Sequence, residues 1–168
     1  MLNFICLGIA AVLVAVDQLV KFWAEHSLSQ VDTIALIPGV FHLTYVQNFG
    51  AAFNTMNNQR LLLVVLTSAV LLVIFVLLLL GKLRSPWMVV SWSLILAGGA
   101  GKLIDRLFRE GGYVVDLFDF RLINFPVFNV ADICVTVGMA LFLIYFIFIE
   151  RKEHRRFEIR QEIKRHEQ

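Results

Sequence analysis

The chain has 168 residues, of which 59% are hydrophobic and only 17% are charged. A soluble globular domain is about 45–50% apolar and about 25% charged, so the composition excludes an ordinary soluble domain. The formal net charge of +2 at pH 7 gives no reason to expect a nucleic-acid partner.

Four segments are apolar and long enough to cross a bilayer as helices. They cover about residues 2–20, 61–80, 87–104 and 130–149. The clearest is the second, LLLVVLTSAVLLVIFVLLLL, which carries no charge and spans about 30 Å as a helix, one hydrocarbon core. None of the segments alternates as a membrane β-strand does. The sequence therefore predicts an all-α membrane protein with four spans.

The first of these segments ends in the motif DQLVK at 17–21, and we expect it to be a retained span rather than a cleaved signal peptide. It lacks a basic start, and no small-residue cleavage site follows it before DQLVK. We therefore keep it as the first span of a membrane domain over residues 1–150. A charged tail over residues 151–168 follows that domain.

Lysine and arginine predict the orientation of the spans. The tail holds seven of these residues, and the short loop GKLRSP lies on the same side. Cytoplasmic segments carry an excess of lysine and arginine, so we expect both termini in the cytoplasm. The two longer loops, about residues 22–60 and 106–129, then lie outside the cytoplasm.

This topology gathers the notable polar residues at the non-cytoplasmic membrane face. They come from the outer ends of three spans and from both outer loops: Asp17, Lys21, Asn48, Lys102, Asp105, Arg106, Asp116, Asn129 and Asp132. Ionisable residues in membrane segments are costly and usually functional. A site at this face is therefore the first hypothesis.

Two pairs among these residues also have a purely structural interpretation. Asp17 and Lys21 are four residues apart, so they can form an ion pair on one helix face, with the lysine reaching toward the headgroups. Asn129 and Asp132 have the spacing of a helix N-cap and its N3 acid, close to a capping box.

The charged residues at the end of the third span also have a purely structural interpretation. Lys102 and Arg106 lie one turn apart near a helix C-terminus, where cations suit the helix dipole. Asp105 can pair with either of them. Gly98 precedes them at the same spacing, so all three positions of this row share one helix face.

Asp116 lies in YVVDLFDF, a β-branched and aromatic run typical of a strand, and Asp119, three residues later, has the alternate facing. Asp116 and Asp132 at one interface suggest a pair of carboxyl groups that share one proton. The ionised member takes a proton from water, and the protonated member polarises a peptide carbonyl. This chemistry needs no metal and no cysteine, and we interpret Cys6 and Cys134 as packed apolar residues.

Five motifs, in order and at the expected membrane edges, resemble those of the bacterial lipoprotein signal peptidases, the signal peptidase II family. They are DQLVK at 17–21, IPGVFHLTYVQNFGAAF at 37–53, GKLIDR at 101–106, VVDLFDF at 114–120 and FPVFNVAD at 125–132. The resemblance covers about residues 10–140. It implies four spans with a small β-rich cradle outside the cytoplasm, for which the segment 34–53 is suited.

The resemblance also implies an activity, a location and site residues. It implies an aspartyl endopeptidase of the bacterial cytoplasmic membrane that removes signal peptides from diacylglyceryl-modified prolipoproteins, cutting just before the lipidated cysteine. The motifs place the catalytic pair on Asp116 and Asp132, and supporting or substrate-binding positions on Asp17, Lys21, Asn48, Gly50, Lys102, Arg106 and Asn129. We expect no cofactor and no metal, a monomer, and membrane lipid and prolipoproteins as partners.

One position departs from the family pattern, because Lys102 stands where the family has an asparagine. A non-catalytic or impaired family member is therefore one alternative. Another is a small proton-coupled transporter or channel subunit, which would also use intramembrane acids. Transporter sites lie near the midplane, whereas the acids here cluster toward one side.

Overall fold

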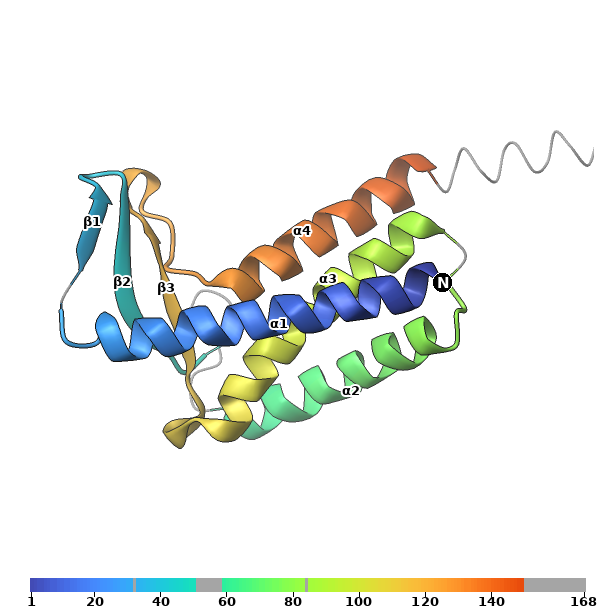
Figure 1. Ribbon diagram of the computed structural model, residues 1–168, viewed down its shortest axis with the longest axis horizontal. Helices are drawn as coiled ribbons and strands as arrows, with labels where there is room; N and C mark the ends of the chain where they lie inside the picture. The colour runs from blue at the N-terminus through green and yellow to red at the C-terminus, as the bar shows by residue number, and fades with distance from the viewer. Residues whose placement is uncertain (32, 51–58, 84, 150–168) are drawn as a thin grey trace, which may run out of the picture.

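The computed structural model describes residues 1–31, 33–50, 59–83 and 85–149. Four long helices lie side by side, and a small sheet sits at one end of the bundle (Figure 1). The helices are α1 (Leu2–Ser27), α2 (Arg60–Leu79), α3 (Pro86–Phe108) and α4 (Val130–Ile144), the last continued by a π-helical turn, Tyr145–Ile149. The tail predicted over 151–168 lies outside the described residues. The predicted fold class, four membrane-spanning helices with a small β-rich part, is confirmed.

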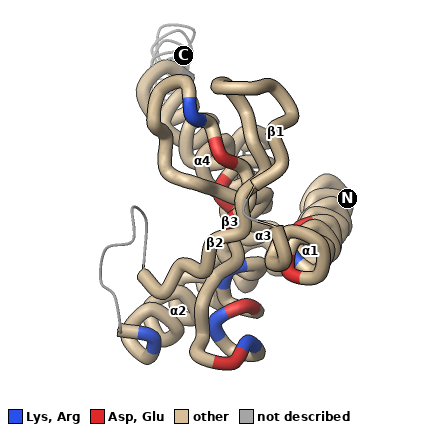
Figure 2. The backbone as a smooth tube through the Cα atoms, turned by 90° about the vertical axis from the view of Figure 1, so that its left-hand side faces the viewer, with Lys and Arg blue, Asp and Glu red and all other residues tan. Residues whose placement is uncertain are grey.

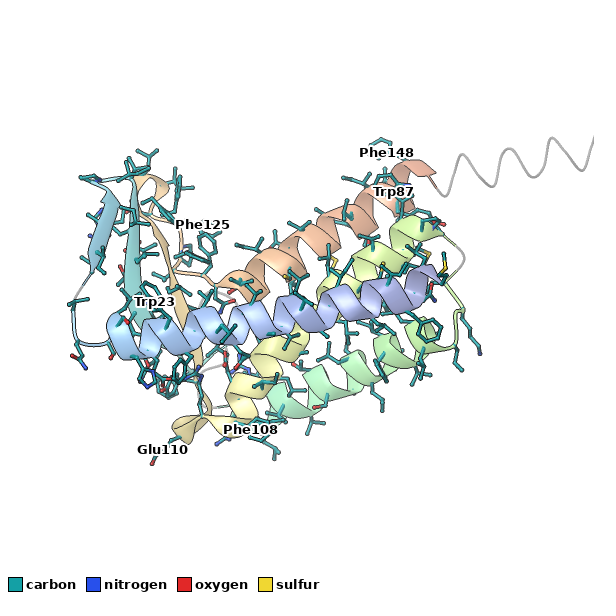
Figure 3. All side chains as sticks on the ribbon, in the orientation of Figure 1. Trp23, Trp87, Phe108, Glu110, Phe125 and Phe148 are labelled. Carbon is teal, nitrogen blue, oxygen red and sulfur yellow. The ribbon has the colours of Figure 1, made fainter. Side chains whose placement is uncertain are left out.

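The helices have the length and surface of membrane spans. Each contains an apolar window long enough to cross a bilayer. Large apolar side chains point outward along them, including Leu72, which is 63% exposed. Trp23 and Trp87 lie toward opposite ends of the bundle (Figure 3), and both are about half exposed. Tryptophan is enriched at both membrane–water interfaces, so these residues suit the two edges of the hydrocarbon layer.

Helix α1 is longer than the predicted span 2–20. Its 26 residues continue to Ser27, about 39 Å at 1.5 Å per residue and longer than a hydrocarbon core. The additional turns pack against the sheet, where Ala24 and Leu28 are buried in one cluster with Val115 and Leu117. The apolar contact with the sheet extends the helix beyond the membrane.

The sheet has three antiparallel strands in the order β1-β2-β3. They are β1 (Ile34–Ile37), β2 (Phe41–Asn48) and β3 (Val114–Phe120). A tight turn with Gly39 at φ 74° joins the first two strands, a backbone conformation that glycine adopts without strain. In the register of β2 and β3, Val46 lies opposite Asp116 and Asn48 lies opposite Val114. Asn48 is therefore a diagonal neighbour of Asp116 on the same face.

Helices α3 and α4 approach closely because α3 carries glycines at the contact. A Cβ atom at Gly98 would lie 2.3 Å from the carbonyl oxygen of Ala131, and one at Gly101 would lie 2.4 Å from Oδ2 of Asp17. Both distances are too short for any side chain. The glycines of residues 97–101 thus permit a close helix approach, and they bring the start of α4 against α3 and α1.

The N-terminus and the end of α4 lie at the same end of the bundle, and the sheet lies at the other (Figure 1). Charged positions gather at the sheet end. Viewed from that side, acidic and basic positions lie next to one another around α1, α3 and β3 (Figure 2).

Candidate active site

Asp116 and Asp132 line the same cavity, although they come from different elements. Asp116 is on β3 and Asp132 is in the first turn of α4. The cavity has a volume of about 380 Å³ and a mostly apolar wall. Its lining also includes Asn48, Lys102, Thr136 and the segment Phe125, Pro126, Val127 and Phe128.

The chain before α4 places Asp132 beside β3. Phe128 forms an isolated antiparallel bridge with Phe118, in which the Phe118 N–H donates to the Phe128 carbonyl at 2.8 Å and the Phe128 N–H donates back at 3.0 Å. The helix then begins with the predicted capping box. Oδ1 of Asn129 accepts from the Asp132 N–H at 2.9 Å, and Oδ2 of Asp132 accepts from the Asn129 N–H at 3.2 Å.

Two asparagine amides hold Asp116. Nδ2 of Asn129 donates to Oδ1 of Asp116 at 2.6 Å, and Nδ2 of Asn48 donates to Oδ2 at 2.9 Å. A backbone N–H fixes the orientation of each amide, because Asn129 Oδ1 accepts from Asp132 and Asn48 Oδ1 accepts from Gly50. Both amides therefore present N–H groups to the carboxyl group.

Gly50, in the loop after β2, and Arg106, on α3, support this arrangement. Nη2 of Arg106 donates to the Gly50 carbonyl at 2.6 Å, and the Gly50 N–H donates to Asn48 at 3.0 Å. Arg106 and Gly50 are buried. A chain of contacts thus leads from α3 through the loop to the amide that binds Asp116.

Asp116 is 3% exposed. Burial raises the pKa of this carboxyl from its ordinary value of 3.8 to about 6, against the opposing hydrogen bond from Asn48. The negative charge of Asp132 also raises the pKa, whereas the ammonium groups of Lys102 and Lys21 lower it. Asp116 can therefore hold or release a proton near physiological pH.

Lys102 lies in the cavity, and its Nζ is 2.5 Å from Oδ1 of Asp132. Its side chain is 26% exposed and that of Asp132 is 31% exposed. Lys102 therefore contacts one of the two acids directly.

Asp17 and Lys21 form a buried ion pair rather than one at the headgroups. Nζ of Lys21 is 2.7 Å from Oδ2 of Asp17 and 2.6 Å from Oδ2 of Asp105, and Lys21 is fully buried. Asp17 also accepts from the Ala131 N–H at 2.9 Å. Asp17 thus anchors the first turn of α4, one residue before Asp132.

The pairing considered for Asp105 was wrong. Asp105 contacts Lys21 and Arg109, the latter at 3.0 Å, instead of Lys102 or Arg106. Asp105 lies one turn before Arg109 on α3, and its side chain reaches Lys21 of α1 at 2.6 Å. Asp105 faces α1, whereas the row of Gly98, Lys102 and Arg106 faces the cavity side.

Asp119 lies apart from the cavity, as its alternate facing predicted. It accepts hydrogen bonds from Thr44 at 2.9 Å and from Arg121 at 2.7 Å. Although burial opposes it, these bonds hold the pKa of Asp119 below its ordinary value. The contacts of Asp119 thus lie within the sheet and the turn that follows β3.

Two polar residues at the site were absent from the predicted set. Gln18 bonds the Gly101 carbonyl at 3.1 Å and both neighbouring acids, Asp17 and Asp105. Thr136 lines the cavity one turn after Asp132. The signal for Thr136 was available, because residues four apart share a helix face.

Comparison with known proteins gives consistent results. A family profile described as signal peptidase (SPase) II matches residues 9–148. Among similar proteins, the lipoprotein signal peptidase of Streptococcus thermophilus is 42% identical over 142 residues, covering 84% of this chain and 92% of that one. The lipoprotein signal peptidase of Brevibacillus brevis is 39% identical over 148 residues, covering 88% and 97%.

A third relative and a solved structure extend this result. The lipoprotein signal peptidase of Trichormus variabilis is 40% identical over 129 residues, covering 77% of this chain and 80% of that one. A bacterial membrane enzyme structure determined by the in meso method has a TM-score of 0.77 at 28% identity, covering 84% of this chain and 87% of that one.

Proposed function

Because this chain belongs to the signal peptidase II family, a family of proteases that remove signal peptides from prolipoproteins, we propose that it is an aspartyl endopeptidase with Asp116 and Asp132 as its catalytic pair. Its substrates are diacylglyceryl-modified prolipoproteins, and it cuts just before the lipidated cysteine. The observation that carries the proposal is the shared cavity, in which two carboxyl groups from separate elements meet inside a mostly apolar wall.

Such a pair hydrolyses a peptide bond without a covalent bond between enzyme and substrate. The ionised carboxylate takes a proton from water, whose oxygen attacks the carbonyl carbon, while the protonated acid gives its proton to the carbonyl oxygen. The resulting diol then collapses. Its C–N bond breaks as the first acid returns a proton to the departing amine, and the second acid recovers its proton from a hydroxyl. Two acids that share one proton are in the correct state at the start of each cycle.

The cavity suits a substrate that remains in the membrane. Ile133 and Val137 of α4 and Phe125 form part of its apolar wall. A diacylated cysteine has two acyl chains, which anchor it firmly in lipid. An acid pair at the end of the spans can therefore reach the bond without extracting either the acyl chains or the apolar signal helix. Besides Asp132 and Thr136, the residues of α4 that line the cavity are the apolar Ile133 and Val137.

We place the site near the extracytoplasmic face of the bacterial cytoplasmic membrane, with both termini in the cytoplasm and the chain acting as a monomer. The lysine and arginine distribution supports this orientation. A cysteine introduced by Glu110→Cys lies at the sheet end, and one introduced by Lys82→Cys lies in the loop between α2 and α3. A membrane-impermeant thiol reagent applied to intact cells is expected to label only the first. Labelling of only the second would invert the protein.

The direct test uses the full chain, purified in detergent, with a diacylglyceryl-modified prolipoprotein. We expect release of the signal peptide, detected by mass, with a new N-terminus at the lipidated cysteine. The matched control is the same prolipoprotein without its diacylglyceryl group, which should be cut far more slowly. A folded chain that leaves the lipidated substrate intact at every pH would contradict the proposal and favour the non-catalytic alternative.

A further inference from the structure

The two acids of the cavity have different partners, although they face the same space. Oδ1 of Asp132 lies 2.5 Å from the Lys102 ammonium, and its Oδ2 accepts a backbone N–H at the start of α4. A cation and a helix N-terminus both stabilise a negative charge. Both carboxyl oxygens of Asp132 thus lie next to positive charge.

Asp116 has no such cation. Among the described residues no ion pair involves Asp116, and its two hydrogen-bond partners are the neutral amides of Asn48 and Asn129. It is 3% exposed, against 31% for the side chain of Asp132. Removing a carboxyl group from water disfavours its charged form. The surroundings of Asp116 therefore favour the protonated acid more than those of Asp132 do.

A proton on Asp116 is compatible with the hydrogen bonds that it accepts. Each carboxyl oxygen has two lone pairs, and each accepts one amide N–H here. The remaining positions can take a proton directed into the cavity. The amides cannot reverse to accept that proton, because backbone N–H groups occupy their own oxygens.

We infer that Lys102 divides the roles of the two acids, holding Asp132 as the carboxylate that takes the proton from water and leaving Asp116 as the acid that carries the shared proton to the carbonyl oxygen. This inference rests on the proposed function. Lys102 acts through Asp132 and is a positioning residue. An asparagine at position 102 has no charge and would make the two acids more nearly equivalent.

The charged groups that act on Asp116 come from every element around it. They are Lys21 of α1, Lys102 and Arg106 of α3, and Asp132 of α4. Lys21 already contacts Asp17 and Asp105, and Arg106 donates to Gly50. Lys102 is the cation whose partner is the second acid of the pair. Its removal therefore leaves Asp132 without its cation and also raises the pKa of Asp116, which the Lys102 charge lowers.

An infrared titration of the detergent-purified chain tests the location of the proton. We expect the absorption of one protonated carboxyl group to disappear near pH 6, with the same band missing from Asp116→Asn and present in Asp132→Asn. The opposite pattern, with the band missing only from Asp132→Asn, would overturn the inference. This measurement does not depend on activity.

The pH dependence of cleavage tests the role of Lys102. We expect Lys102→Asn to move the alkaline limb of the kcat/KM profile upward by about half to one pH unit, three- to tenfold in the protonated fraction. Lys102→Arg keeps the charge, so its alkaline limb should stay at the wild-type pH even if its rate changes. If Lys102→Asn is active and its alkaline limb also stays at the wild-type pH, the inference fails. If the wild type cleaves nothing while the infrared titration behaves as expected, the proposed function fails and the location of the proton stands.

Discussion

Lys21 and Lys102 make aspartate contacts of nearly equal length, Lys21 between α1 and α3 and Lys102 between α3 and α4. Lys21 is within 2.7 Å of Asp17 and 2.6 Å of Asp105, and all three side chains are almost completely buried. Lys102 is 2.5 Å from Asp132, but each of these side chains is about a quarter to a third exposed in a cavity. The distances alone do not separate a structural pair from a functional one.

The difference lies in what else the charges can reach. The Lys21 cluster is closed, because its acids are also bonded to Gln18, Arg109 and the first turn of α4. No substrate can enter it. The Lys102 pair faces open space beside Asp116, so its electrostatic effect acts on whatever occupies the cavity. Exposure to a cavity, rather than the presence of an ion pair, identifies the reactive side of α3.

The largest effect is expected at the acids of the cavity. Asp116→Asn and Asp132→Asn should each reduce turnover of the lipidated substrate by about 10²–10⁴-fold or more, because each removes a proton-transfer group. Thermal unfolding in detergent should show that both variants remain folded. Substantial activity in either one would exclude that residue from the pair.

The next effect separates the two lysines. Lys21→Met removes a buried cation and leaves two acids partly uncompensated, so we expect a loss of about 3–5 kcal/mol of stability, measured by denaturation in detergent. The matched variant Lys102→Met removes a partly exposed partner and should cost about 0–1 kcal/mol. Equal losses from the two variants would mean that burial does not distinguish these pairs.

The start of α4 offers a finer test of the closed cluster. Gly101→Ala places a Cβ 2.4 Å from Oδ2 of Asp17, so this carboxylate, whose Oδ1 accepts from the Ala131 N–H, must shift. We expect about 1–3 kcal/mol of destabilisation and lower turnover, because the first turn of α4 carries Asp132. Gly8→Ala in α1, where no atom lies within 4 Å of the added Cβ, is the control. A fully active, equally stable Gly101→Ala variant would show that Asp17 does not position Asp132.

The smallest effect is expected at Asp119. Asp119→Asn removes a carboxylate that is bonded to Thr44 and Arg121, away from the cavity. Cleavage should change by only a few fold. The bonds lower the pKa of Asp119, so the stability they provide is present above pH 4 and declines as the pH falls below its ordinary value of 3.8. A loss of turnover as large as that of Asp116→Asn would mean that Asp119 is the reacting acid.

The sequence alone determined the four spans and the capping box of α4. An uncharged run such as residues 61–80 has no stable alternative to a membrane helix, because lipid satisfies none of its backbone groups. Asn129 and Asp132 are three residues apart, so their contact depends only on local helix geometry. The facing of Asp116 against Asp119 likewise follows from the period of a strand.

The tertiary structure decided which charges meet. Asp105 could be assigned to Lys102 or Arg106 from spacing, yet it contacts Lys21 of another helix. Lys102 contacts Asp132, thirty residues away in sequence. Which aspartate each lysine contacts depends on how α3 is rotated about its axis between α1 and α4. The close approach at Gly98 and Gly101 sets that rotation. Periodicity defines the faces of a helix, but only the packing of the neighbouring helices determines which face meets which partner.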